Sequence, residues 1–135
     1  MHVQLSRSFA ERMKAIALGY EDPDGVAPCL LVVSARGVVV EKSVADSWAK
    51  GTFASPVDSL ERHFEKHAAG RTRQQYTCDA LRFFEENQHL AQWGRWNPNW
   101  SESFRVKIGA RNGYYTPGGR ILSYWDDYGR REAIV

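Results

Sequence analysis

Two histidines four residues apart offer the first chemistry in this sequence. His63 and His67 lie in "SLERHFEKHAAGRTRQQY", residues 59–76, where Lys66 precedes the second histidine. Residues at positions i and i+4 share one face of a helix, so the pair could bind a metal ion or simply line a helix face. Alternatively, one imidazole could move a proton, because histidine titrates near neutral pH.

The metal-binding and nucleophile hypotheses find little support in the spacing of other residues. In "HFEKH" the glutamate is third, not second as in the H-E-x-x-H pattern of zinc metalloproteases, and no third ligand follows at a readable spacing. Cys29 and Cys78 carry no local catalytic signature. A small metal-dependent hydrolase is therefore the weakest hypothesis, and we expect no cofactor.

Metal-free acid–base chemistry on RNA is the third possibility. An imidazole can remove the proton of a ribose 2′-OH, while a nearby cation stabilises the charge that develops on the phosphate. Residues 104–125 include several aromatic side chains that could stack on exposed bases. The same residues include no acid and four basic side chains: Arg105, Lys107, Arg111 and Arg120. The composition permits a ribonuclease but does not demonstrate one.

The length and composition predict one domain, residues 1–135, with enough apolar residues for a core. A formal net charge of +2 is too small to indicate an anionic partner by itself, so the placement of charge matters more. The two cysteines are predicted to be reduced and buried. No signal peptide or membrane-length apolar run is visible, so we expect a soluble protein that acts in the cytoplasm, without a membrane partner. Delivery by a larger carrier is compatible with this.

The fold class predicted from the pattern is α+β. An amphipathic helix is expected over residues 6–20, followed by two short strands around a turn at residues 35–37. Residues 45–54 fit either a helical turn or an irregular connection. Two central helices and a C-terminal antiparallel sheet of three or more strands complete the expected order, with the helices packed on the sheet.

The two central helices have clear start signals. Ser55 is placed to cap the first, with Pro56 next and Gly70 at its end. A capping box, Thr72-x-x-Gln75, opens the second, which should continue to residue 92 or so. The apolar side of the second helix is predicted to contain Tyr76, Ala80, Phe83, Phe84 and Leu90.

The predicted sheet contains the strands "FRVKIGA", "YYT" and "RILSYW", with a hairpin turn at Asn112–Gly113 between the first two and a turn at "PGG" before the third. On a period of two, Ser123 shares a face with Ile121 and Trp125, which is either a site or core. Tyr114 and Tyr115 should point to opposite faces, so at most one faces a ligand. The remaining tryptophans are expected to form a satellite core or a base-stacking platform: Trp93, Trp96 and Trp100.

The combination and order of these motifs resemble a known group of toxins. Lys66–His67–Ala68 at a helix end, a second helix and the closing strand Leu122–Ser123–Tyr124–Trp125 look like the nuclease domain of colicin D, which has a K-H-A motif and an S-x-W strand. More broadly, residues 55–128 are similar to toxin domains of the barnase–EndoU–colicin–RelE superfamily of ribonucleases. The role of residues 1–54 is not explained by this resemblance.

The resemblance implies helices packed on an antiparallel sheet whose exposed face binds RNA. It implies that His67 is the general acid or base, that Lys66 and Ser123 assist at the phosphate, and that Trp125 shapes the site. Further substrate contacts are expected from a wider set of residues: His63, Arg71, Arg73, Lys107, Thr116, Arg120 and Tyr124. Two departures from the family pattern are "AAGRTR" after the histidine and the acidic pair after Trp125.

The sequence thus leads to two main hypotheses. The first is a metal-independent endoribonuclease toxin that cleaves tRNA or another structured RNA by 2′-OH attack, leaving a 2′,3′-cyclic phosphate. Such a toxin implies a cognate immunity or antitoxin protein that is acidic enough to cover the basic sheet. The second is a non-catalytic phage or mobile-element module that grips RNA or a host protein and does not need His67.

Overall fold

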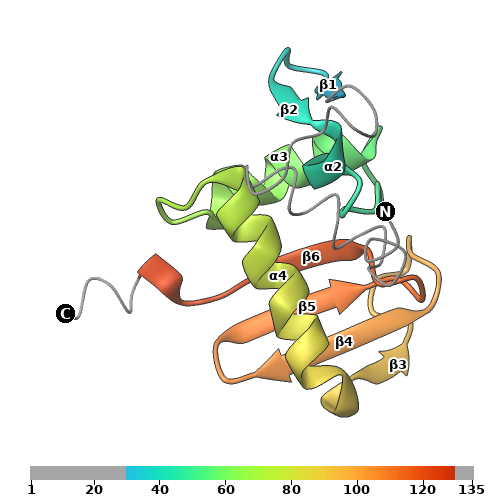
Figure 1. Ribbon diagram of the computed structural model, residues 1–135. Helices are drawn as coiled ribbons and strands as arrows, with labels where there is room; N and C mark the ends of the chain where they lie inside the picture. The colour runs from blue at the N-terminus through green and yellow to red at the C-terminus, as the bar shows by residue number, and fades with distance from the viewer. Residues whose placement is uncertain (1–29, 130–135) are drawn as a thin grey trace, which may run out of the picture.

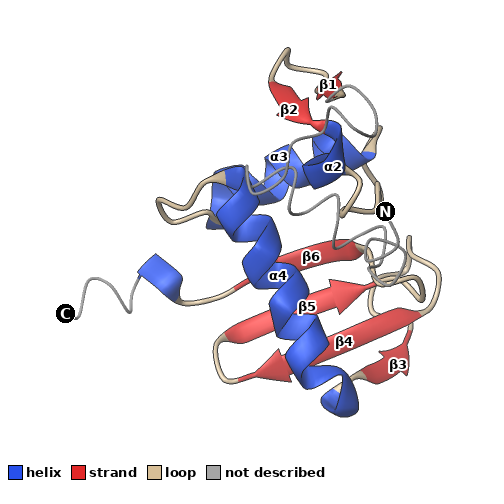
Figure 2. Ribbon diagram, viewed as in Figure 1, coloured by secondary structure: helices blue, strands red, loops and turns tan. Residues whose placement is uncertain are grey.

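A computed structural model describes residues 30–129 and shows the predicted α+β architecture (Figures 1 and 2). Two short antiparallel strands come first, then helices, then a four-stranded antiparallel sheet in the order β3-β4-β5-β6. The predicted helix at residues 6–20 and Cys29 lie outside the described residues. The elements are β1 (Leu31–Val33), β2 (Val39–Glu41), α2 (Lys42–Ala45), α3 (Pro56–His67), α4 (Arg73–Asn87), η3 (Gln88–Leu90), β3 (Gln92–Gly94), β4 (Ser103–Ile108), β5 (Arg111–Tyr115) and β6 (Ile121–Trp125).

The core lies between α4 and one face of the four-stranded sheet. Figure 2 shows α4 crossing this face, with α3 beyond the β6 edge. Two tyrosines of the sheet are fully buried against α4: Tyr115 donates a hydrogen bond to the carbonyl of Ala80, and the carbonyl of Tyr124 accepts one from Tyr76. Trp48 is also fully buried, and its indole N–H donates to Thr77 of α4. Residues before position 55 therefore contribute to the same core.

Both helix starts are confirmed. The Ser55 hydroxyl accepts from the backbone N–H of Asp58 at the start of α3, and Pro56 is its first residue. The complete capping box forms at α4, because Thr72 and Gln75 exchange side-chain-to-backbone hydrogen bonds. These local interactions satisfy N–H groups that have no partner within the helix, which is why they can be recognised from sequence. Within residues 30–129, no helix is long and apolar enough to cross a membrane.

The predicted end of the second central helix was wrong. α4 ends at Asn87 rather than at Gln92, and a single 3₁₀ turn separates it from β3. The Asn87 side chain donates to the carbonyl of Phe83, a local bond that competes with helix continuation. Leu90 is consequently exposed rather than part of the apolar side. Gln92, the expected helix end, instead forms an edge strand with Trp93 and Gly94, which were expected to lie in a turn-rich connection.

The predicted hairpin turn was misplaced as well. β4 and β5 are joined by Gly109 and Ala110, and Gly109 has a positive φ of 58°. Asn112 and Gly113 instead lie inside β5. Gly113 is needed there for a packing reason, since a Cβ at this position would overlap the phenol ring of Tyr115.

A bulge in β6 changes which residues share a face. Tyr114 pairs with Ser123, but Tyr115 pairs with Ile121, so Leu122 is an extra residue in β6. Ile121 therefore joins the core with Tyr115 and Tyr124, and it does not share a face with Ser123 as strict alternation predicted. Ser123 and Trp125 remain together on the face turned away from α4, which we call the outer face.

Candidate active site

The structure brings His67 and Trp125 together from distant parts of the chain. His67 is the last residue of α3, and Trp125 is the last residue of β6. Their ring centroids are 6.0 Å apart, with an angle of 32° between the planes. Both side chains are half-buried, so each keeps an accessible part. The preceding residue, Lys66, is exposed at the same helix end.

A buried arginine fixes this meeting of α3 with β6. Arg71 is only 4% exposed. Its guanidinium donates to the main-chain carbonyls of His67 and Ala68, at 3.0 and 2.9 Å. The same group forms a bidentate pair with Asp126, at 2.9 and 3.0 Å, and also bonds Asp79. Arg71 thus caps the negative end of α3 and ties it to the residue after Trp125.

Asp126 is the centre of this network, which we call the Arg71–Asp126 clamp. Besides Arg71, its carboxylate accepts from the Tyr124 hydroxyl at 2.7 Å and from the backbone N–H of Tyr128 at 3.2 Å. Burial by itself would raise the pKa of Asp126, but the hydrogen bonds from Arg71 and Tyr124 outweigh it and keep the pKa below its ordinary value. The clamp therefore carries a permanent buried carboxylate beside the catalytic candidate.

The electrostatic surroundings of His67 favour its neutral form. Burial lowers the pKa of the His67 imidazole, and the positive charges of Lys66 and Arg71 lower it further, while Asp126 acts in the opposite direction. A neutral imidazole is the form that can accept a proton. The surroundings of His67 thus shift its equilibrium toward the neutral imidazole.

His63 occupies a different environment, although it lies one helical turn away. Its ring stacks on Trp48 at 5.4 Å and meets the edge of Phe53 at 5.7 Å. Its Nδ1 lies 2.7 Å from the carbonyl oxygen of Ser59. Burial is the main cause that lowers the pKa of His63. These contacts integrate His63 into the packing between α3 and residues 48–53, and substrate binding by His63 stays a prediction.

The arginines after His67 are engaged in structural ion pairs. Arg71 is buried in the clamp, so its guanidinium has no exposed surface for a phosphate. Arg73 donates to both carboxylate oxygens of Glu61, at 2.6 and 2.7 Å, and its guanidinium lies over Phe64. Tyr124, also expected to contact substrate, is fully buried, and its hydroxyl bonds Asp126 and accepts from Arg111. In the structure these three side chains are therefore engaged with protein partners, and substrate contact by them stays a prediction.

The remaining residues that were predicted to contact substrate lie near opposite ends of β6. Lys107 is exposed and pairs with Asn112, which in turn pairs with Trp125, so these three residues form one row on the outer face. Thr116 and Arg120 close the β5–β6 turn, where Thr116 Oγ1 accepts from the backbone N–H of Arg120. That turn precedes Ile121, at the opposite end of the strand from Trp125.

Ser123 lies between these ends on the outer face. It is 8% exposed and pairs with Tyr114. Its hydroxyl makes no hydrogen bond to another group within residues 30–129. A hydroxyl in this state can donate to an incoming oxyanion without first breaking another bond.

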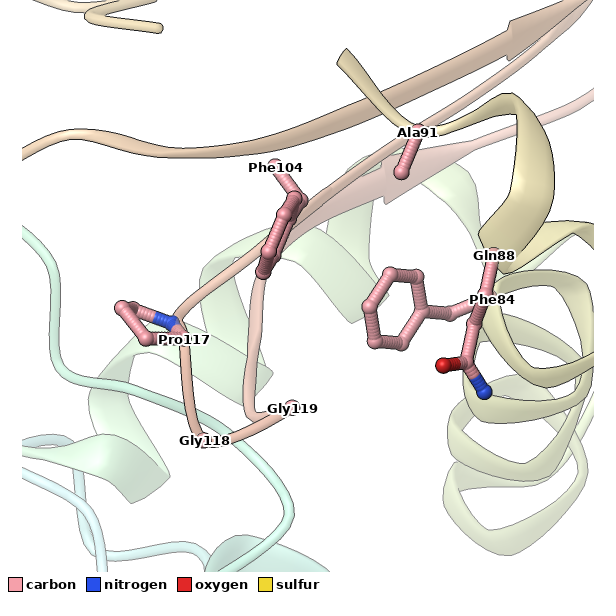
Figure 3. A pocket seen from close by; sticks show the side chains of 7 residues that line it. All are labelled: Phe84, Gln88, Ala91, Phe104, Pro117, Gly118 and Gly119. Atoms are coloured by element: carbon pink, nitrogen blue, oxygen red, sulfur yellow. The ribbon is translucent and has the colours of Figure 1, made fainter. Parts of the chain in front are cut away.

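Two further observations on the described residues concern possible metal ligands and a pocket on the helix-covered side of the sheet. Among residues 30–129, no group of three or more His, Cys, Asp or Glu side chains is placed to hold a metal ion. A pocket of about 400 Å³ lies between the end of α4, β4 and the β5–β6 turn. It contains no titratable side chain and is lined as shown in Figure 3 by Phe84, Gln88, Ala91, Phe104, Pro117, Gly118 and Gly119.

Two features of the site could not be found by motif inspection. Asp126 belongs to the acidic pair that departs from the family pattern, and Arg71 belongs to the other departure, "AAGRTR". The structure shows that these residues are the two halves of one buried ion pair. Only the opposite charges of two unusual segments could have suggested their pairing.

The comparison with known proteins supports a nuclease relationship over part of the chain. An 86-residue stretch is 32% identical to the tRNA(Glu)-specific nuclease WapA of Bacillus subtilis subsp. natto. The match covers 57% of this chain and 3% of that protein. No family model matches the chain, and no solved structure matches it.

Proposed function

We propose that this protein is an endoribonuclease of the toxin type that needs no metal ion and cleaves tRNA or another structured RNA. The observation that carries the proposal is a half-buried His67, biased toward its neutral form, beside Trp125 and next to Lys66. The likeness to a tRNA-specific nuclease supports the choice of substrate. Arg105 and Lys107, which lie on the outer face in a segment without acidic residues, support a polyanion there.

In the proposed reaction, His67 removes the proton from a ribose 2′-OH. The 2′-oxygen then forms a bond to the adjacent phosphorus, and the bond from phosphorus to the 5′-oxygen breaks. The products are a 2′,3′-cyclic phosphate and a 5′-hydroxyl, after the leaving oxygen has taken up a proton. Lys66 and Ser123 stabilise the negative charge on the phosphate oxygens, and Trp125 shapes the site.

The clamp has a positioning role in this scheme. Arg71 and Asp126 hold the last turn of α3 against the end of β6, so that His67 and Trp125 keep a fixed relationship. Their side chains are each 2% exposed, which places them behind the reacting groups rather than among them. Fixing a base to within a fraction of an ångström is a substantial part of enzymatic rate enhancement.

The biological setting is proposed on the same basis. A toxin with this chemistry acts where RNA is, in the cytoplasm, and delivery into target cells would be by a larger carrier. A cognate immunity or antitoxin protein would block it most simply by covering the basic outer face with acidic side chains.

The test is incubation of purified wild-type and His67→Ala protein with total bacterial RNA in the presence of EDTA. Discrete RNA fragments from the wild type alone, ending in a 2′,3′-cyclic phosphate, are expected, with DNA left intact. Cleavage of DNA, or equal cleavage by both proteins, would contradict the proposed mechanism. Intact RNA with a folded wild-type protein would favour a binding module that does not use His67.

A further inference from the structure

A row of aromatic rings leads away from His67 across the outer face. Trp125 is followed by Tyr114 at 5.7 Å and then by Trp100 at 5.6 Å between ring centroids. We call Trp125, Tyr114 and Trp100 the aromatic row. The rings come from β6, β5 and the β3–β4 connection, and all three are half-buried. The row thus begins beside the proposed base and presents partly accessible rings over successive elements.

Cations accompany the row, and one of them is held in a fixed position. Arg105 pairs with Tyr114 across the sheet. Its guanidinium lies 3.9 Å from the centroid of the Trp96 ring and donates to Gln92 at 2.8 Å. Trp96 is itself fixed by a hydrogen bond from its indole N–H to the carbonyl of Ser103. Lys107, two residues after Arg105 in β4, adds an exposed positive charge to the outer face.

The helix-covered face carries a different arrangement, because its cation Arg111 packs on Phe83 of α4 and bonds the hydroxyl of the buried Tyr124. Trp93 is 49% exposed, but its ring packs on the edge of Phe104, which contacts Phe84 of α4. Trp93 therefore lies on the opposite side of the sheet from the aromatic row. The contrast gives a matched tryptophan that should not participate in binding at the outer face.

From these positions we infer that the aromatic row is a binding subsite for unpaired nucleotides adjacent to the bond that is cut. Aromatic rings beside cations are the usual means of holding single-stranded nucleic acid, because every base can stack and every phosphate attracts a positive charge. Bases in a duplex are already stacked and cannot meet these rings. The inference rests on the proposed function and adds that the substrate is single-stranded for up to three nucleotides at this point.

The experiment measures binding separately from cleavage. The full-length His67→Ala protein is titrated against a fluorescent oligoribonucleotide of about 12 nucleotides, a length within known single-strand site sizes. The same oligoribonucleotide in a perfect duplex is the competing probe. Trp100→Leu and Trp100→Phe are made in this background, with Trp93→Leu as the matched control. Circular dichroism and a thermal melt establish that each variant is folded.

We expect the single strand to bind at least about tenfold more tightly than the duplex. Trp100→Leu should weaken binding by roughly 5- to 100-fold, the loss associated with one base–aromatic stack. Trp100→Phe should restore most of the affinity, and Trp93→Leu should leave it unchanged. If Trp100→Leu does not fold, Tyr114→Leu and Tyr114→Phe take its place with the same expectations.

Equal affinity for the single strand and the duplex would overturn the inference, and so would equal binding by folded Trp100→Leu and Trp100→Phe proteins. Failure of the proposed function is distinguishable from this. If the binding pattern is as expected but the protein with His67 intact cuts no RNA, the subsite stands and the ribonuclease proposal fails. If RNA is cut equally well by wild-type and Trp100→Leu proteins, the ribonuclease stands and the subsite fails.

Discussion

The two faces of the C-terminal sheet are built from alternating residues of the same strands, yet they differ in what surrounds their aromatic rings. On the helix-covered face, Tyr115 and Tyr124 are fully buried and make hydrogen bonds to specific partners. On the outer face, Tyr114 and Trp125 are half-buried, and Tyr114 lies opposite Arg105. Aromatic content alone therefore does not separate core from binding surface, whereas the exposure of the rings does.

Substitution of the adjacent residues Tyr114 and Tyr115 is the strongest test of the difference between the two faces. Tyr115→Ala should lower the free energy of unfolding by about 3–5 kcal/mol, since it empties a core position and removes the hydrogen bond to Ala80. Tyr114→Ala should cost much less stability but weaken RNA binding or cleavage. Urea unfolding and RNA titration of both variants check this. Similar stability losses in the two proteins would show that the outer face is core as well.

The Arg71–Asp126 clamp predicts that the free energy of unfolding depends on the Asp126 carboxylate and, through it, on pH. Asp126→Asn should lower the free energy of unfolding by about 3 kcal/mol at neutral pH, because Arg71 keeps its buried charge and loses its main partner. The folded state keeps the pKa of Asp126 below its ordinary value of 3.8. The stabilisation is therefore complete above that pH and is lost as the pH falls below it. Glu86→Gln, at an exposed position of α4, is the control for urea unfolding at pH 7 and pH 3.

The pH profile of cleavage tests the general-base role proposed for His67. Burial together with Lys66 and Arg71 lowers the pKa of His67, so kcat/KM should reach half its plateau below pH 6.5 and rise with pH. Asp126 opposes this shift, so Asp126→Asn should move the midpoint to still lower pH. Initial cleavage rates between pH 4.5 and 8 measure both midpoints. A midpoint above 6.5 in the wild type would contradict the assigned environment.

The smallest expected effect concerns the charge on the outer face. Lys107→Ala should reduce the dependence of log K for single-stranded RNA on log salt concentration by about 0.7, the value for one phosphate contact. Arg82→Ala is the matched control, since Arg82 is an exposed cation on α4. The measurement is RNA affinity over a range of salt concentrations. An equal reduction in both variants would mean that the protein attracts RNA without a preferred face.

Sequence reasoning succeeded where the causes are local. The caps at Ser55 and Thr72 and the short strands around residues 35–37 involve residues close together in the chain. It failed in the sheet, where the pairing of the strands and the packing of their side chains decide the outcome. Glycine is required at position 113 because the Tyr115 ring occupies the space of a Cβ atom. The bulge at Leu122 moves Ile121 to the core side. Both patterns look like ordinary turn and strand signals until the strands are paired.

The candidate site was predictable in part for the same reason. The K-H-A and S-x-W motifs directed attention to His67 and Trp125, which the fold brings within ring contact. The partners of Arg71 could not be inferred, because Asp126 lies 55 residues away in sequence. The aromatic row was equally hidden, since Trp100 meets Tyr114 only after the β3–β4 connection folds back over the sheet.

The most direct test of the proposed proton transfer by His67 compares the two histidines of α3. Single-turnover cleavage of RNA with EDTA present is measured for wild-type, His67→Ala and His63→Ala proteins that are shown to be folded. Loss of a general base costs about 10²- to 10⁴-fold, so His67→Ala should lose at least 100-fold in rate. His63→Ala should lose some stability and stay within a few-fold of the wild-type rate. Comparable losses in both variants, or a fully active His67→Ala protein, would contradict the assignment of the proton transfer to His67.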